Sequence, residues 1–282
     1  MSYPKGTVMH KSSSIPVVLT IAGSDSGGGA GIQADIKAIS ATGGYAASVI
    51  TAITSQNTLG VTDILPIPLA HIESQLDAVF GDLNIVAVKI GMLADSDIIH
   101  LVADKLRQYR PQFIVLDPVM VATSGDLLLK QSAISSLKEC LLPLADIITP
   151  NLPEAAALTG LEQPNNADEI NDMVLSLRQL GTSAVLLKGG HLEQSSYSDD
   201  LLITQNEIHQ LSAERIDTIN THGTGCTLSS AIASFLAQGD DLQQSVSHAK
   251  EYITLAIGSA DKLSVGQGRG PVDHFFMLHQ SK

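Results

Sequence analysis

The chain is most distinctive for what it has little of: it contains no tryptophan, only two cysteines, and 4% aromatic residues in 282. Hydrophobic residues nevertheless make up 44% of the sequence. The core must therefore be built mainly from Ala, Ile, Leu and Val, which suits a parallel sheet covered by helices on both faces. Two cysteines are too few for a disulfide framework. We expect Cys140 to be a small buried apolar residue, which leaves Cys226 as the candidate for chemistry.

Positive charge is also scarce, with 16 Lys and Arg against 29 Asp and Glu, a formal net charge of −13. This balance excludes a general nucleic-acid binder, because no basic surface is available to replace counterions. Any bound phosphate must be held by backbone N–H groups, a metal ion and a few chosen lysines.

Long apolar runs are missing as well. Residues 1–14 lack the apolar segment of a signal peptide, and no run reaches membrane-spanning length. We therefore expect a soluble, cytoplasmic protein that does not bind membranes, with a flexible N-terminal extension over residues 1–16 and one domain over residues 17–282. No repeat, low-complexity segment or interdomain linker interrupts that domain.

Short β-branched runs alternate with helical patterns, which is typical of repeated βαβ units. Strands are predicted at 17–21, 47–54, 86–90, 113–116, 146–149 and 184–187. Helices are predicted at 31–42, 96–109 and within 227–262, the first with Ile32, Ile36 and Ile39 on one face. Residues 198–213 predict a hairpin at the sheet edge. The pattern indicates an α/β fold with a mostly parallel central sheet and helices on both faces.

Polar and glycine residues follow the ends of these strands, where open α/β sheets bind ligands. They are a glycine-rich loop at 23–31, then Gln56, Lys89, Met92, Asp117, Asn151, Glu154 and Lys188. Taken singly, Asp117 before Pro118 is an ordinary turn former and Asn151 an ordinary helix cap. Their placement at one end of one sheet favours a functional site.

The segment 221–226 reads Thr-His-Gly-Thr-Gly-Cys and leads into a helical run. Gly223 and Gly225 free the backbone to turn the N–H groups of residues 223–226, Thr224 included, towards one point. The positive end of the helix points there too, so the segment predicts a site for a phosphate or a developing oxyanion. A helix N-terminus lowers a thiol pKa, which makes Cys226 a candidate base or nucleophile. The alternative is a plain glycine turn before a helix.

The glycine-rich loop is neither a P-loop nor a good dinucleotide fingerprint, which disfavours an NAD-binding oxidoreductase. Its glycines allow close backbone approach to a flat ligand. Asp35 lies one helical turn beyond Gly31 and either lines the site or only complements the helix dipole. The nine histidines show no paired zinc-ligand spacing. A Mg²⁺ ion fits better, with Asp117 and Glu154 as its candidate ligands.

At this point the motifs match a known family. The chain resembles the hydroxymethylpyrimidine/phosphomethylpyrimidine kinases of thiamine biosynthesis, members of the ribokinase-like superfamily, from about Val17 to Phe275. The residues that carry the resemblance, in order, are 22–25, 28–35, 89–93 (Lys-Ile-Gly-Met-Leu), 115–120, 149–155, 188–191 and 221–226.

The resemblance implies a three-layer sandwich and an ATP-dependent kinase that acts as a homodimer. Such an enzyme phosphorylates 4-amino-5-hydroxymethyl-2-methylpyrimidine and then converts the monophosphate to the diphosphate. The implied pyrimidine contacts are Gly23, Gln56, Met92 and Val119, with Asp35 also lining the site. Gln56, which is Glu in some members, would read the exocyclic amine and a ring nitrogen. Asn151, Glu154, Lys188 and Thr221 would serve ATP and Mg²⁺, with Asp117 near the metal.

In-line phosphoryl transfer needs positioning and charge neutralisation more than covalent chemistry. The amides of residues 223–226 would stabilise the charge on the transferred group. Cys226 stands where most ribokinase-like sugar kinases have an aspartate base, so it either accepts the hydroxymethyl proton or only shapes the turn.

Three rival functions remain at this point: a kinase for pyridoxal, a kinase for hydroxyethylthiazole, and a non-catalytic pyrimidine-binding protein on the same scaffold. The 33–35 and 89–92 segments favour the pyrimidine enzyme. Whether loops 23–31 and 118–128 close over a substrate stays open.

Overall fold

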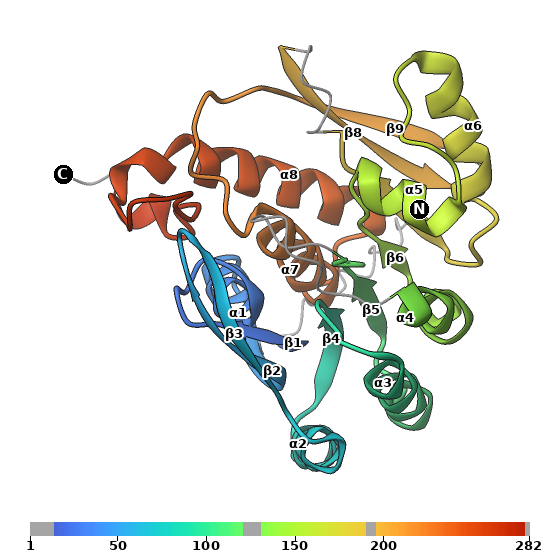
Figure 1. Cartoon of the computed structure of the whole chain (residues 1–282), viewed down its shortest axis with the longest axis vertical. Coiled ribbons are helices and arrows are strands. Elements are labelled where there is room, and N and C mark those ends of the chain that lie inside the picture. The colour runs from blue at the N-terminus through green and yellow to red at the C-terminus, as the bar shows by residue number, and fades with distance from the viewer. Residues whose placement is uncertain (1–13, 121–130, 190–195, 280–282) are drawn as a thin grey trace, which may run out of the picture.

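A computed structural model describes residues 14–120, 131–189 and 196–279. In these ranges nine strands form one sheet, in the order β3-β2-β1-β4-β5-β6-β7-β8-β9 (Figure 1). Neighbours from β2 through β7 pair in parallel, whereas β3, β8 and β9 pair antiparallel at the two edges. The strands are β1 Val17–Asp25, β2 Tyr45–Asn57, β3 Gly60–Pro66, β4 Ile85–Ile90, β5 Phe113–Leu116, β6 Ile147–Ile148, β7 Ala184–Leu187, β8 Tyr197–Thr204 and β9 Ile208–Glu214. The predicted α/β class with a mostly parallel sheet is confirmed.

Helices cover both faces of this sheet, so the molecule has three layers. The helices are α1 Gly31–Ala41, α2 Leu69–Asp82, α3 Ser96–Tyr109, α4 Gln131–Ser136, α5 Leu152–Thr159, α6 Ala167–Leu177, α7 Thr224–Ala237 and α8 Leu242–Gly258, with short turns at Leu137–Leu141, Leu142–Leu144, Ala260–Lys262 and Phe276–His279. One aliphatic core packs the sheet against α2 to α6, and the other packs it against α1, α7 and α8. Cys140 is only half-buried and packs at the margin of the first core.

The predicted apolar face of α1 is partly wrong. Ile32 and Ile39 are buried, but Ile36 is 36% exposed. The buried face of this helix also contains Ala34, Asp35 and Ala38. It is therefore centred further round the helix than the isoleucine spacing alone indicates, and Ile36 lies at its margin.

Helix α7 brings the predicted anion-binding turn over the middle of the sheet. It packs against β1, β4 and β5, and also against α1 and α8. The turn before it is tied to the C-terminal loop by an isolated bridge between His222 and Pro271. Since the parallel strands all end on one side, their loops and the start of α7 surround the same space.

Three sequence expectations fall partly on residues that are not described. The N-terminal extension lies outside the described residues over 1–13, and most of the loop 118–128 lies outside them over 121–128. The last two residues of the 188–191 motif also lie outside the described residues. None of the helices in the described ranges is long and apolar enough to cross a membrane.

Candidate active site

The turn at 221–226 has the geometry of an anion-binding helix start. Gly223 precedes the first residue of α7 with a left-handed backbone, φ 78° and ψ 8°. A Cβ at this position would overlap the carbonyl oxygen of Gly29, so only glycine fits where the turn meets the glycine-rich loop. Thr224 is held by its hydroxyl, which donates to the carbonyl oxygen of Thr221 at 2.7 Å. The first free N–H groups of the helix therefore point out of a rigid turn.

A cluster of one lysine and two carboxylates faces this turn. Lys188 Nζ lies 3.2 Å from Asp117 Oδ1 and 4.0 Å from Glu154 Oε2. A Cβ built on Gly225 would stand 3.2 Å from Lys188 Nζ and 3.5 Å from Asp117 Oδ2. The helix start therefore lies close against the charged cluster, with no side chain of residue 225 between them.

Burial and neighbouring charges shift the pKa values of Glu154 and Lys188 in this cluster. For Glu154 the larger cause is burial. It raises the pKa of Glu154 to about 7, with Asp117 adding to the rise and Lys188 opposing it. Burial also acts to lower the pKa of Lys188, but the charges of Asp117 and Glu154 outweigh it and raise that pKa. Lys188 therefore stays charged. Among the ion pairs of the described residues, it is the cation that contacts both Asp117 and Glu154.

Asn151 has the local role that its type predicts. Its side chain accepts from the N–H of Glu154 at 2.9 Å, and the Glu154 carboxylate accepts from the N–H of Asn151 at 2.9 Å. This capping box begins α5. It holds Glu154 towards Lys188, because Asn151 and Lys188 themselves form a bridge between the ends of β6 and β7.

A cavity of about 860 Å³ joins these groups. Its polar end includes Gln56, Asp117, Asn151, Glu154, Lys188 and the whole 221–226 turn. The rest of its lining mixes aliphatic residues, among them Ile216, Leu228, Ile253 and Ile257, with charged residues such as Asp200 and Lys250. No sequence pattern marks these aliphatic residues as cavity lining, because aliphatic residues on helix faces normally signify only core packing.

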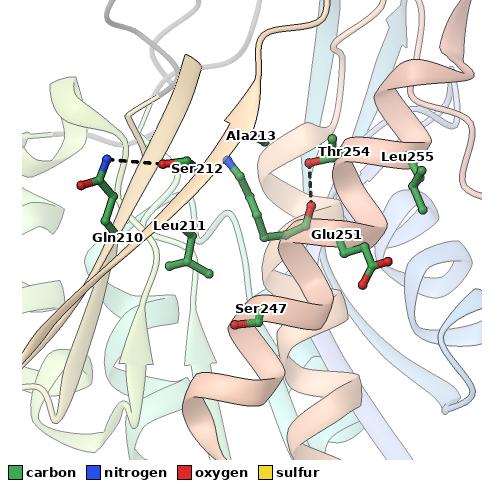
Figure 2. Close-up of a pocket in the computed structure, with 9 residues that line it drawn as sticks. Gln210, Leu211, Ser212, Ala213, Ser247, Glu251, Thr254 and Leu255 are labelled. Carbon is green, nitrogen blue, oxygen red and sulfur yellow. Dashed lines mark hydrogen bonds between the residues drawn. The ribbon is translucent and has the colours of Figure 1, made fainter.

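Figure 2 shows a second hollow, of about 470 Å³, between β9 and α8. It shares Ala213, Lys250 and Thr254 with the large cavity. Its dashed hydrogen bonds are local: Gln210 bonds Ser212 at 3.4 Å, and the Thr254 hydroxyl donates to the Lys250 carbonyl at 2.7 Å. This hollow therefore flanks the large cavity without adding a cluster of reactive groups.

A magnesium ion suits the polar end better than a zinc ion does. In the part of the chain that the structure describes, no three His, Cys, Asp or Glu side chains come together as a metal cage. Asp117 and Glu154 nevertheless offer two carboxylates near the anion-binding turn. One or two carboxylates, completed by water and substrate phosphates, are what Mg²⁺ ordinarily takes.

Comparison with known proteins identifies the family of the chain. Residues 25–273 match the model of the phosphomethylpyrimidine kinase family. The chain is 52% identical over 259 residues to the hydroxymethylpyrimidine/phosphomethylpyrimidine kinase of Rhizobium meliloti, covering 92% of this chain and 97% of that relative. The chain belongs to the phosphomethylpyrimidine kinase family. It is accordingly a phosphotransferase.

Solved structures give the same fold. The phosphomethylpyrimidine kinase from Clostridium difficile is 45% identical, with a TM-score of 0.75, covering 86% of this chain and 99% of that chain. The ADP complex of Bacillus subtilis pyridoxal kinase is 35% identical, with a TM-score of 0.86, covering 94% and 99%. The ribokinase-like sandwich inferred from the motifs is confirmed.

Within this kinase fold, the predicted acidity of Cys226 is wrong in direction. Burial raises the pKa of the Cys226 thiol to about 11. The positive charge of Lys89 opposes this effect, but the carboxylates of Asp35 and Asp117 add to it. The helix start alone therefore does not make the thiol a ready thiolate at neutral pH.

Asp35 is also placed differently from the expectation. It is fully buried and pairs with the equally buried Lys89 at 2.8 Å. The hydroxyls of Thr20 and Ser230 donate to the same carboxylate at 2.6 and 2.8 Å. Asp35 is not part of the cavity lining. It joins α1, β1, β4 and α7 beneath the site, so neither the substrate contact nor the exposed helix-dipole role describes it.

The remaining predicted pyrimidine contacts fall into two groups. Gln56 and Val119 line the cavity. Gly23 and Met92 contact each other, since a Cβ on Gly23 would run into the Met92 methyl group. Neither of these two belongs to the lining.

Asp35→Asn is expected to destabilise the protein by about 3–5 kcal/mol, because it leaves the buried Lys89 charge without its partner. Denaturant unfolding measures this loss. Asp104→Asn, which removes an exposed partner of Arg107, is the control and should change stability little. Unchanged stability with a large rise in the pyrimidine KM would show instead that Asp35 contacts substrate.

Proposed function

We propose that this kinase transfers the γ-phosphoryl group of ATP to the hydroxymethyl group of 4-amino-5-hydroxymethyl-2-methylpyrimidine, and then phosphorylates the monophosphate to the diphosphate. The observation that carries the proposal is the meeting of Lys188 Nζ, Asp117 Oδ2 and the start of α7 at Gly225, on the wall of the cavity. Cation and backbone amides can converge there on one phosphoryl group.

The lining of the cavity suits the two parts of a nucleotide. Its aliphatic residues, among them Ile216, Leu228 and Ile253, offer apolar surface to a purine ring. Lys188, Asn151 and Thr221 would then meet the phosphates at the polar end. Mg²⁺, held by Asp117 and Glu154, would neutralise phosphate charge. The net charge of −13 makes such concentrated positive groups necessary for phosphate binding.

The acceptor pyrimidine would lie against Gln56 and Val119, with Gly23 and Met92 in support. Gln56 can exchange a pair of hydrogen bonds with the exocyclic amine and a ring nitrogen. This placement directs the hydroxymethyl group towards Gly225 and Cys226. Positioning and charge neutralisation then supply most of the catalysis, because the transferred group passes through a loose transition state.

Cys226 is the nearest candidate to accept the hydroxymethyl proton, and its raised pKa gives a testable pH dependence. For a thiol with a pKa of about 11, each increase of one pH unit, as long as the pH is well below 11, makes the thiolate about ten times more abundant. The kcat of the wild-type protein is expected to rise from pH 7.5 to 9.5, and Cys226→Ala should lose both the rise and most of kcat. A flat profile with near-normal kcat in the variant would leave Cys226 only the role of shaping the turn.

A pyridoxal kinase is the second candidate, favoured by the high structural similarity to the Bacillus subtilis enzyme. Parallel assays with ATP, Mg²⁺ and either alcohol separate the two. We expect kcat/KM for the hydroxymethylpyrimidine to exceed that for pyridoxal. No turnover of the pyrimidine alongside brisk turnover of pyridoxal would reject the proposal. A homodimeric state and a cytoplasmic location stay predictions.

A further inference from the structure

A chain of hydrogen bonds links the glycine-rich loop to the anion-binding turn through Asp25 and His222. The Asp25 carboxylate, 3% exposed, accepts from the N–H groups of Gly27, Gly29 and Ala30 at 2.8, 3.0 and 2.8 Å. His222 Nε2 lies 2.9 Å from the same carboxylate. The loop and the turn are thereby fastened together beside the cavity, whose lining includes Ala30 and His222.

The partners of Asp25 decide which atom of His222 carries a hydrogen. Burial acts to raise the pKa of Asp25, but the hydrogen bonds from His222 and the loop amides outweigh it and hold that pKa below its ordinary value. An ionised carboxylate only accepts hydrogen bonds. His222 Nε2 is therefore protonated and donates to Asp25.

The same nitrogen also faces the end of the Gln56 side chain. Gln56 Nε2 lies 3.3 Å from His222 Nε2, and Gln56 Oε1 lies 3.1 Å from Thr54 Oγ1. The single hydroxyl hydrogen of Thr54 is already directed to the Ser24 carbonyl oxygen, at 2.7 Å. With the amide in this orientation, the Gln56 Nε2 donor faces the His222 Nε2 donor, and the Gln56 Oε1 acceptor faces the Thr54 hydroxyl oxygen, whose hydrogen points elsewhere. Reversing the amide places its nitrogen, a donor, against Thr54 Oγ1 and its oxygen, an acceptor, against His222 Nε2, whose one hydrogen is then shared between Asp25 and Gln56.

We propose that His222 and Thr54 together fix the Gln56 amide with its oxygen towards His222 and its nitrogen towards Thr54. These two positioning residues thereby set the donor–acceptor order in which Gln56 reads the substrate ring. The inference rests on the proposed function, since it takes the aminopyrimidine as the ligand of Gln56. Both ends of the network, Ser24 and Asp25, belong to the glycine-rich segment, so the reading group is anchored on both sides by one loop.

The fixed amide keeps one hydrogen on its nitrogen and one lone pair on its oxygen for a ligand. A 4-aminopyrimidine offers the matching pattern, a donor amine beside an acceptor ring nitrogen. The 4-oxo analogue, 5-hydroxymethyl-2-methylpyrimidin-4-one, offers the reverse pattern. A fixed amide must reject it, whereas an amide that is free to turn can accept either ring.

The test is the ratio of kcat/KM for the 4-amino substrate to that for the 4-oxo analogue. We expect the wild-type protein to favour the amino substrate by at least about tenfold, the value of roughly one well-made hydrogen bond to a buried polar group. His222→Ala and Thr54→Val should each lower this ratio about tenfold. Thr62→Val is the matched control, since that exposed threonine bonds only the Ser55 carbonyl oxygen among the described contacts and should leave the ratio unchanged.

A merely structural role would lower kcat/KM for both rings equally and leave the ratio unchanged. An unchanged ratio in folded His222→Ala would overturn the inference, and if that variant does not fold, Thr54→Val decides in the same way. Failure of the wild-type protein to turn over the amino substrate at all would reject the proposed function itself. That outcome is distinguishable, because it appears before any variant is made.

Discussion

Gly225→Ala is expected to lower kcat about a hundredfold, by displacing the phosphoryl group or Lys188, while leaving the fold intact. The new methyl group would stand 3.2 Å from Lys188 Nζ and 3.5 Å from Asp117 Oδ2, beside the point where the phosphoryl group is proposed to pass. Alanine fits a helix well, and Gly225 lies within the first turn of α7 without a left-handed backbone. Steady-state kinetics and thermal unfolding on the same preparation measure the two effects.

Gly81→Ala is the matched control for this variant. Gly81 also lies in a helix, α2, and a Cβ there would meet nothing within 4 Å. It should leave kcat unchanged and raise stability slightly, by the ordinary helix preference for alanine. Near-normal kcat in Gly225→Ala would mean that the phosphoryl group does not pass this point.

Lys188→Met is expected to lower kcat about a hundred- to a thousandfold as well, the usual effect of removing one group that stabilises transition-state charge. The substitution keeps the apolar stem and removes the ammonium group next to Asp117 and Glu154. It also leaves two buried carboxylates without their cation, so the variant should be less stable. Kinetics with saturating ATP separate the loss of kcat from weaker nucleotide binding.

Lys105→Met controls for the loss of a paired lysine. Lys105 Nζ contacts Asp77 at 2.7 Å and Glu73 at 2.9 Å, and its side chain is 10% exposed, but it joins α2 and α3 away from the cavity lining. It should affect stability without changing kcat. An equal loss of kcat in both variants would show that Lys188 acts only through stability.

The elements most readily predicted were those whose own residues define them. The bounds of α3 follow from its apolar stripe, and those of β5 and β7 follow from short apolar runs that contain β-branched residues. The sequence indicated neither β3 nor α2. Most of β3 is exposed, so no alternation of apolar and polar residues marks it, and it forms by pairing with β2. Helix α2 buries only Ile72 and Leu76, which is too short a stripe to be distinctive.

The candidate site also contains some features that the sequence could predict and others that it could not. The anion-binding turn and the residues at the strand ends could be predicted, because glycine spacing and the rule of carboxyl ends act locally. The placement of Asp35 could not, because it depends on Lys89, a residue 54 positions away. The raised pKa of Cys226 has the same kind of cause, since burial outweighs the helix start that the sequence makes visible.

The central claim is that one site performs both phosphoryl transfers, and a ³¹P NMR time course tests it most directly. Wild-type protein with ATP, Mg²⁺ and the hydroxymethylpyrimidine should form the monophosphate first and then convert it to the diphosphate. Gly225→Ala should lose both steps to a similar extent, since both cross the space beside Lys188. A monophosphate that is never phosphorylated further, or a variant that loses only one of the two steps, would contradict the claim.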